Sequence, residues 1–275
     1  MGTAAHAGMP LIRAYNSPAA LSATQPARRA ARKPPSDWFI RLILTFGCLA
    51  ACAQEPPPNL ARQIAHRETE TQAVRNDYTY RQTVVFAELD SRGAQTGEYR
   101  EVRDVILSPE HQRTEQMVGK PSMNLKRLIM TDEDFRDMRD IQPFVMTEDQ
   151  LWNYETKFRG DEKVDDVDCW VLQVRPRQIL AGQRLFDGLL WVDKKDYSIV
   201  RLEGQAVPQI RSMKSENLFP RFTTLRQLVD GQHRFPIFTY ADDTLPFRNG
   251  LQRVRMSIRY TNYQRFGADS VIKFK

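Results

Sequence analysis

The sequence predicts an α+β domain built mainly from an antiparallel β-sheet. Ten segments are rich in aromatic and β-branched residues, most of them are joined by short turn clusters, and few segments have the pattern of a helix. Strands that follow one another through short turns pair antiparallel. The strand candidates are 78–89, 98–107, 111–118, 151–158, 168–175, 185–192, 198–207, 223–229, 233–240 and 251–264.

Residues 1–53 form a leader and are separate from the predicted domain. A basic block at 28–33 is followed by a short apolar run from Trp38 to Ala51 and then by small residues. This order is typical of a secretory signal peptide. Leu49 to Cys52 matches a lipobox, in which Cys52 would be acylated, whereas Ala51 to Ala53 matches an ordinary signal-peptidase site. Both alternatives place the folded protein outside the cytoplasm.

The positive charge of the chain belongs largely to this leader. The whole chain carries a formal net charge of +6. Residues 1–53, with six Lys and Arg and one Asp, account for +5 of it. The rest is nearly neutral, so the sequence does not predict nucleic-acid binding. Cys169 is the only cysteine after the leader and is expected to be a small core residue.

The remaining chain, 54–275, is interpreted as one domain. Residues 54–77 begin with a Pro-rich tether and continue as a polar helix. Two strands at 78–107 form a hairpin around a turn cluster. Residues 122–142 interrupt the strands with one or two helices, since Thr131 precedes three acidic residues. Turns are expected at Gly160-Asp161 and at Asp230-Gly231, the second joining a hairpin.

Motifs that would indicate catalysis are absent from the sequence. It contains no Gly-x-Ser-x-Gly, His-Glu-x-x-His or P-loop motif, and its four histidines are scattered. Acidic clusters at 132–134, 165–168 and 242–243 are interpreted as solvated turns and a helix start, with calcium or paired-carboxylate chemistry as the less favoured alternative. We therefore predict no catalytic residue, no metal and no cofactor.

Aromatic residues are concentrated on the predicted strands, and several strands are apolar on both faces. A single antiparallel sheet usually leaves one face in water. Two apolar faces indicate either a well-covered core or a hydrophobic cavity. The residues expected in the wall of such a lipid-binding cavity are Trp152, Tyr154, Trp170, Leu172, Leu190, Val192 and Phe222. Because strand faces alternate, a one-residue shift would replace Leu190 and Val192 by Leu189 and Trp191.

Residues 151–207 resemble the LolA/LolB-like superfamily of bacterial outer-membrane lipoprotein-sorting proteins. The features are a Gly-x-x-x-Val stretch at 160–164, Cys-Trp-x-Leu at 169–172, and Leu-Trp-Val-Asp at 190–193 before a charged turn. The tail at 259–270 resembles a subgroup of these proteins. The resemblance implies a curved open sheet, or incomplete barrel, covered by a few helices. It also implies an apolar cavity for acyl chains, and this chain departs from the family in its extended first helix and its insertion at 122–142.

The favoured function is a non-enzymatic carrier or binder of lipid or lipoprotein acyl chains, in the periplasm or at the outer membrane. The alternatives are a structural or partner-binding envelope protein with a filled core, and a hydrolase whose site has no recognised motif. A void in the interior would favour the carrier, and titratable groups gathered around a pocket would favour the hydrolase. The oligomeric state is not predicted.

Overall fold

The computed structural model describes residues 55–107, 113–141, 143–211 and 216–265. The leader, including Cys52 and both processing sites, lies outside the described residues. The described residues fall within a single compact unit, Ala51–Lys275.

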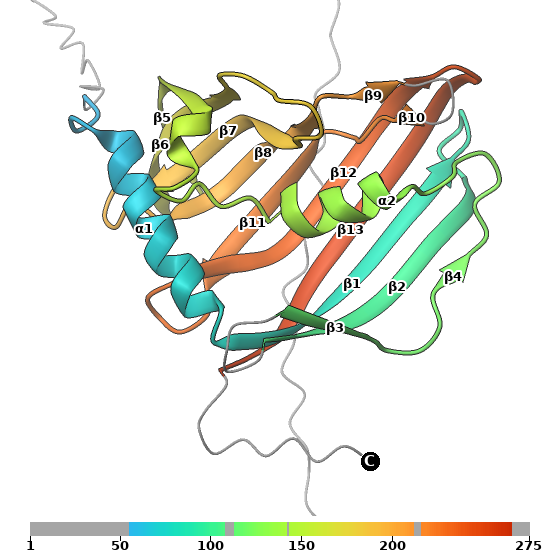
Figure 1. The fold of residues 1–275 in the computed structure, drawn as a ribbon, viewed down its shortest axis with the longest axis horizontal. Helices are drawn as coiled ribbons and strands as arrows, with labels where there is room; N and C mark the ends of the chain where they lie inside the picture. The colour runs from blue at the N-terminus through green and yellow to red at the C-terminus, as the bar shows by residue number, and fades with distance from the viewer. Residues whose placement is uncertain (1–54, 108–112, 142, 212–215, 266–275) are drawn as a thin grey trace, which may run out of the picture. The chain divides into compact units, whose positions relative to one another are not determined.

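The large sheet is antiparallel and open. Its strands run in the order β3-β2-β1-β13-β12-β11-β8-β7-β6-β5, with β4 paired to β2 (Figure 1). The strands are β1 (Tyr78–Leu89), β2 (Gln95–Leu107), β3 (Arg113–Met117), β4 (Ser122–Met123), β5 (Tyr154–Val164), β6 (Val167–Pro176), β7 (Leu185–Asp193), β8 (Ile199–Val207), β11 (Phe222–Leu228), β12 (Arg234–Phe247) and β13 (Gly250–Arg265). A separate pair contains β9 (Ile210–Arg211) and β10 (Glu216–Asn217). The predicted fold class is confirmed.

The last strand returns to the middle of the sheet and lies beside the first. β13 pairs with β1 along nearly its whole length, with Val84 opposite Ile258. The sheet thereby joins two groups of strands. One contains β1 to β4, and the other contains β5 to β8.

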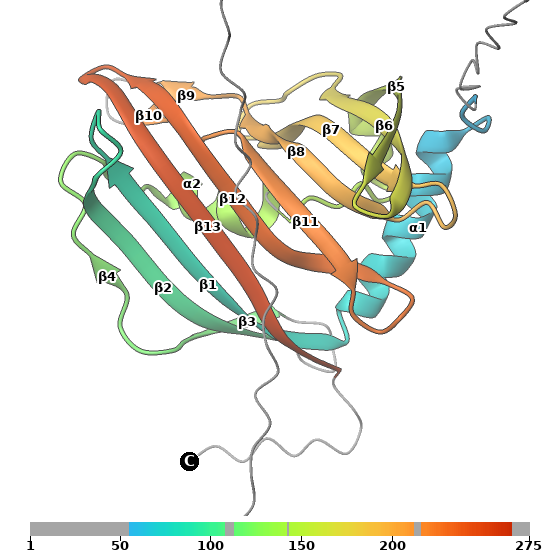
Figure 2. The same ribbon diagram turned by 180° about the vertical axis from the view of Figure 1, so that it is seen from behind.

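The helices lie on one face of the sheet, as the two opposite views show (Figures 1 and 2). They are α1 (Leu60–Arg75), α2 (Asp132–Arg136), the π-helical turn η1 (Asp137–Ile141) and the 3-10 turn η2 (Leu151–Asn153). α1 buries Leu60 and Ile64, and also Glu68. Thr131 caps α2 through a reciprocal pair of bonds with Asp134.

Three local predictions were wrong. Gly160 is not in a turn: the chain bulges there, at φ 129°, and β5 continues to Val164, so the turn falls at Asp165-Asp166. Residues 151–153 form η2 rather than strand. The pair Asp242-Asp243 lies within β12, where Asp242 is neutralised by two arginines of β13.

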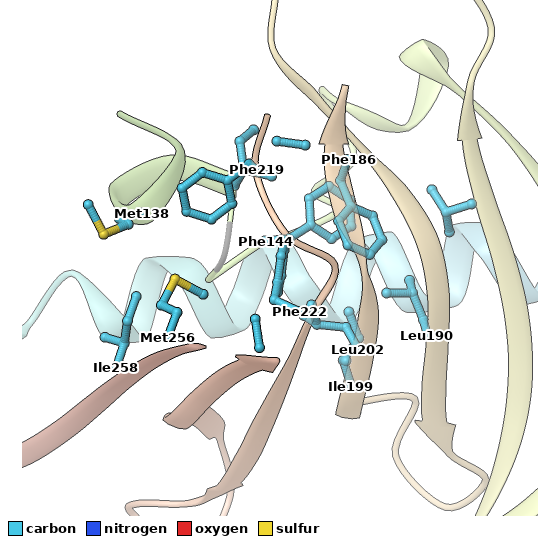
Figure 3. Close-up of a cluster of buried hydrophobic side chains, with 14 of the residues drawn as sticks. Met138, Phe144, Phe186, Leu190, Ile199, Leu202, Phe219, Phe222, Met256 and Ile258 are labelled. Atoms are coloured by element: carbon cyan, nitrogen blue, oxygen red, sulfur yellow. The ribbon is translucent and has the colours of Figure 1, made fainter. Parts of the chain in front are cut away.

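The main core lies between the sheet and its helices. Phe144, from the segment that follows η1, stacks on Phe186 of β7 with ring centroids 4.5 Å apart. Figure 3 shows these two rings among Phe222, Leu190 and Leu202. The opposite face carries a smaller buried cluster around Cys169 and Trp191. The half of the helix-covered face formed by β6 to β8 is therefore filled.

Candidate functional site

A cleft of about 490 Å³ opens on the helix-covered face and is lined by strands from both halves of the sheet. Its walls come from the last turn of α1, from η1, from segment 143–145 and from η2. Strands β1 and β2 contribute Tyr80 and Val105, and the first residues of β5 and β7 contribute Tyr154 and Leu185. The volume falls within the range of about 300–1,000 Å³ that is usual for small-molecule sites.

Part of the cleft surface is aromatic or aliphatic. The apolar lining residues are Tyr80, Val105, Ile141, Pro143, Phe144, Val145, Tyr154 and Leu185. Phe144 and Tyr154 also contact each other edge to face, with centroids 5.6 Å apart. Both are buried, so this part of the wall is rigid and continuous with the core.

The rest of the lining is polar and rich in hydrogen-bond donors. It contains the amides Gln72, Asn76, Gln150 and Asn153, the arginines Arg75, Arg113, Arg139 and Arg184, and one carboxylate, Asp140. The cleft therefore joins an apolar surface to a donor-rich one. Such a lining suits an amphiphilic ligand better than a purely apolar one.

Two buried ion pairs fix the walls in place. Arg226 of β11 donates from Nη1 to both carboxylate oxygens of Glu68 on α1, at 3.0 and 2.9 Å, and from Nη2 to the carbonyl oxygen of Phe144. Both charged side chains are only 1% exposed. This contact links α1, the sheet and segment 143–145 at one point, and charge-assisted bonds of this kind are among the stronger ones in proteins.

The second pair holds η1 against the strands. Arg184 donates from Nε to Oδ1 of Asp137 at 3.0 Å, and its Nη2 bonds to the other carboxylate oxygen. Burial raises the pKa of Asp137, and the adjacent guanidinium of Arg184 opposes that shift. Arg184 thereby anchors the wall that carries Arg139 and Asp140.

Most of the predicted cavity residues lie together, but in the packed core. Tyr154, Trp170, Leu172, Leu190, Val192 and Phe222 are all 4% exposed or less and belong to one cluster. Of these, Tyr154 lines the cleft. Trp170 stacks on Tyr197 and borders a different recess. The expected wall is covered by α1 and by Phe144 and Met146.

Trp152 does not share a strand face with Tyr154. It lies in η2, before β5 begins, and its side chain is 70% exposed. A 3-10 turn does not alternate its side chains between two faces, so Trp152 does not lie in the wall expected from a strand over 151–158.

The residues that sequence reasoning missed are the arginines of the cleft. Arg75, Arg139 and Arg184 come from a helix end, a π-turn and the residue before β7. No sequence motif links these positions, because the cleft is assembled by tertiary packing. Their shared charge is visible only once the segments are brought together.

Several other features of the described residues bear on the chemistry. In the ranges that the structure describes, no three His, Cys, Asp or Glu side chains are placed to hold a metal ion. Burial raises the pKa of the Cys169 thiol to about 12, which makes it a poor nucleophile. None of the described helices has the length and apolar character needed to cross a membrane.

No protein-family model matches this chain, and no curated protein matches its sequence. Solved structures do match. The chain is similar to a DUF1329 family protein from Desulfovibrio piger (13% identity, 78% of this chain and 96% of that one, TM-score 0.39). It is also similar to a LolA superfamily protein from Nitrosomonas europaea (11% identity, 73% and 93%, TM-score 0.31). A third is an outer membrane lipoprotein-sorting protein domain from Vibrio parahaemolyticus (10% identity, 74% and 92%, TM-score 0.34).

The second and third of these proteins carry the family name that residues 151–207 suggested. Identities of 10–13% and TM-scores of 0.31–0.39 assign no function to this chain.

Proposed function

We propose that this chain is a non-enzymatic carrier or binder of lipid or lipoprotein acyl chains that works in the periplasm or at the outer membrane. The observation that supports the proposal is the 490 Å³ cleft and the aromatic and aliphatic side chains in its lining. Each methylene transferred from water to such a surface contributes about 0.8 kcal/mol. A contact of several carbons would therefore give measurable affinity.

A titration with a fluorescent fatty-acid probe tests this proposal. Val145 lines the cleft and is partly exposed, so the larger side chain of Val145→Trp would occupy space that a bound acyl chain needs. We expect the probe affinity to fall by about tenfold or more, the equivalent of about two buried methylenes. Val118→Trp is the matched control, because Val118 is 40% exposed and does not line the cleft.

A second candidate is a structural or partner-binding envelope protein. The filled core around Phe144 and Phe186 favours it, because most of the predicted cavity wall is packed rather than hollow. Wild-type protein that takes up no probe, at concentrations where fatty-acid binders saturate, would reject the carrier and leave this candidate.

Export is a separate part of the proposal and is supported by the basic, apolar and small-residue order of residues 28–54. Mass spectrometry of protein purified from envelope fractions would locate the mature N-terminus and detect acylation of Cys52. Cys52→Ser should release an acylated protein from membranes, because acyl chains supply its anchor. An uncleaved, full-length protein found in the cytosol would overturn this part.

A further inference from the structure

Each arginine in the described ranges either forms an ion pair or is exposed to solvent, with two exceptions. Most of them form an ion pair with a carboxylate. Those that form no ion pair within the described ranges are exposed to solvent, apart from Arg75 and Arg139, which are partly buried. Both exceptions line the same cleft.

Partial burial without a counter-charge makes these two guanidinium groups unusual. An exposed arginine is solvated by water, whereas a partly buried one loses some of that solvation and gains nothing in return. Arg75 ends α1 and Arg139 lies in η1, so they enter the cleft from two different elements. A bound anion would supply the missing counter-charge at both.

The other two arginines of the cleft already form ion pairs. Arg184 is paired with Asp137, and Arg113 is paired with Glu115. Asp140 is the one carboxylate of the lining, and it is exposed, so water screens its charge. The unpaired charges of the lining therefore favour an anion.

We infer that the cleft selects amphiphiles whose apolar chain ends in a carboxylate or phosphate group. Arg75 and Arg139 bind the anionic head, because a guanidinium donates two parallel hydrogen bonds to either group. The apolar chain of the ligand lies against Tyr80, Phe144 and Val145. This inference rests on the proposed function and narrows its ligand to one chemical class.

The test compares two ligands with the same chain and different heads. Dodecanoate and dodecan-1-ol are titrated into the protein at neutral pH by calorimetry or by displacement of the fluorescent probe. We expect wild-type protein to bind dodecanoate at least about tenfold more tightly. Arg75→Gln and Arg139→Gln should each reduce this preference to about threefold or less through a loss of affinity for dodecanoate.

Arg62→Gln is the matched control for charge. Arg62 also lies on α1 and forms no ion pair among the described residues, but it is exposed and does not line the cleft. The control should keep the full preference for dodecanoate. An equal loss in Arg62→Gln would show that net charge alone is responsible and would overturn the inference.

The remaining outcomes separate this inference from the proposed function. Equal affinity of the wild type for both ligands would overturn the anionic-head inference and leave the acyl-chain binder standing. Binding of neither ligand would reject the proposed function itself. Inorganic phosphate that displaces dodecanoate at an equal concentration would show a small-anion site without chain recognition, and would also overturn the inference.

Discussion

Removing one partner of the Glu68–Arg226 pair should destabilise the fold more than any surface substitution. The pair is 1% exposed on both sides, so Glu68→Leu leaves a guanidinium inside the protein with only the Phe144 carbonyl as acceptor. Breaking a buried pair in this way costs about 3–5 kcal/mol. For a domain of this size that corresponds to a loss of about 6–20 °C in melting temperature.

A double variant separates the cost of leaving one buried charge unpaired from the cost of losing the whole pair. Glu68→Leu/Arg226→Met removes both charges and keeps apolar volume, which is often nearly neutral because no charge remains to be solvated. We expect the double variant to lie within about 2 kcal/mol of wild type, although each single variant loses more. Urea unfolding followed by tryptophan fluorescence measures all three, and the m value should stay unchanged.

A surface pair provides the control for this cycle. Arg81 and Asp104 are joined at 2.7 Å but are 40% and 36% exposed. Asp104→Ala should cost less than about 1 kcal/mol, because water screens such pairs. Single core variants that lose as little as this control, or a double variant whose loss equals the sum of the single losses, would refute the account.

Three further predictions follow from local geometry. Gly188→Ala would place a methyl group 2.2 Å from a backbone oxygen of β8 and 2.5 Å from the Phe186 ring, so it should cost at least about 1–3 kcal/mol in a urea titration; an unchanged midpoint would contradict this packing. Cys169, with a pKa raised to about 12, should resist a thiol reagent at mildly alkaline pH and react after unfolding; rapid labelling of the folded protein would contradict its burial. Partial burial raises the pKa of Asp230, but hydrogen bonds from the backbone and ring of His233 prevail and lower it to about 2. Asp230→Ala should therefore cost about 1–2 kcal/mol at neutral pH, and the difference should shrink as the pH falls below about 4, because the unfolded carboxyl then binds protons that the folded one does not; a pH-independent difference would contradict the shift.

The strands were predictable where alternation and turn chemistry agree. Residues 78–89 have the predicted bounds as β1, because an aromatic and β-branched run ends at the turn that begins with Asp90. β12 is longer than predicted because Asp242-Asp243 has the composition of a turn. In the structure, Asp242 lies opposite Arg255 on β13 and is paired with it. That neutralisation depends on cross-strand register, which the order of residues in a single strand does not contain.

The position of the cleft depends on a segment that has no periodic pattern. Aromatic residues concentrate on β5 to β8, and the prediction placed a cavity there because large apolar side chains can line one. The same side chains can instead fill the space. Phe144 and Met146, in the irregular segment after η1, complete that packing and are 3% and 0% exposed.

The open part of the helix-covered face is bordered by residues 143–145 of segment 143–147, which do not fill it. After Val145 the chain turns toward η2, and Thr147 accepts backbone bonds from Gln150 and Leu151. The face near Tyr80 and Val105 is left bordered by the ends of α1 and η1. Helix ends and short turns are solvated regions where arginine and amide side chains are common, so the opening acquires a polar rim. The irregular segment thus fills one part of the face and borders the cleft, and the ends of α1 and η1 supply the charges at its edge.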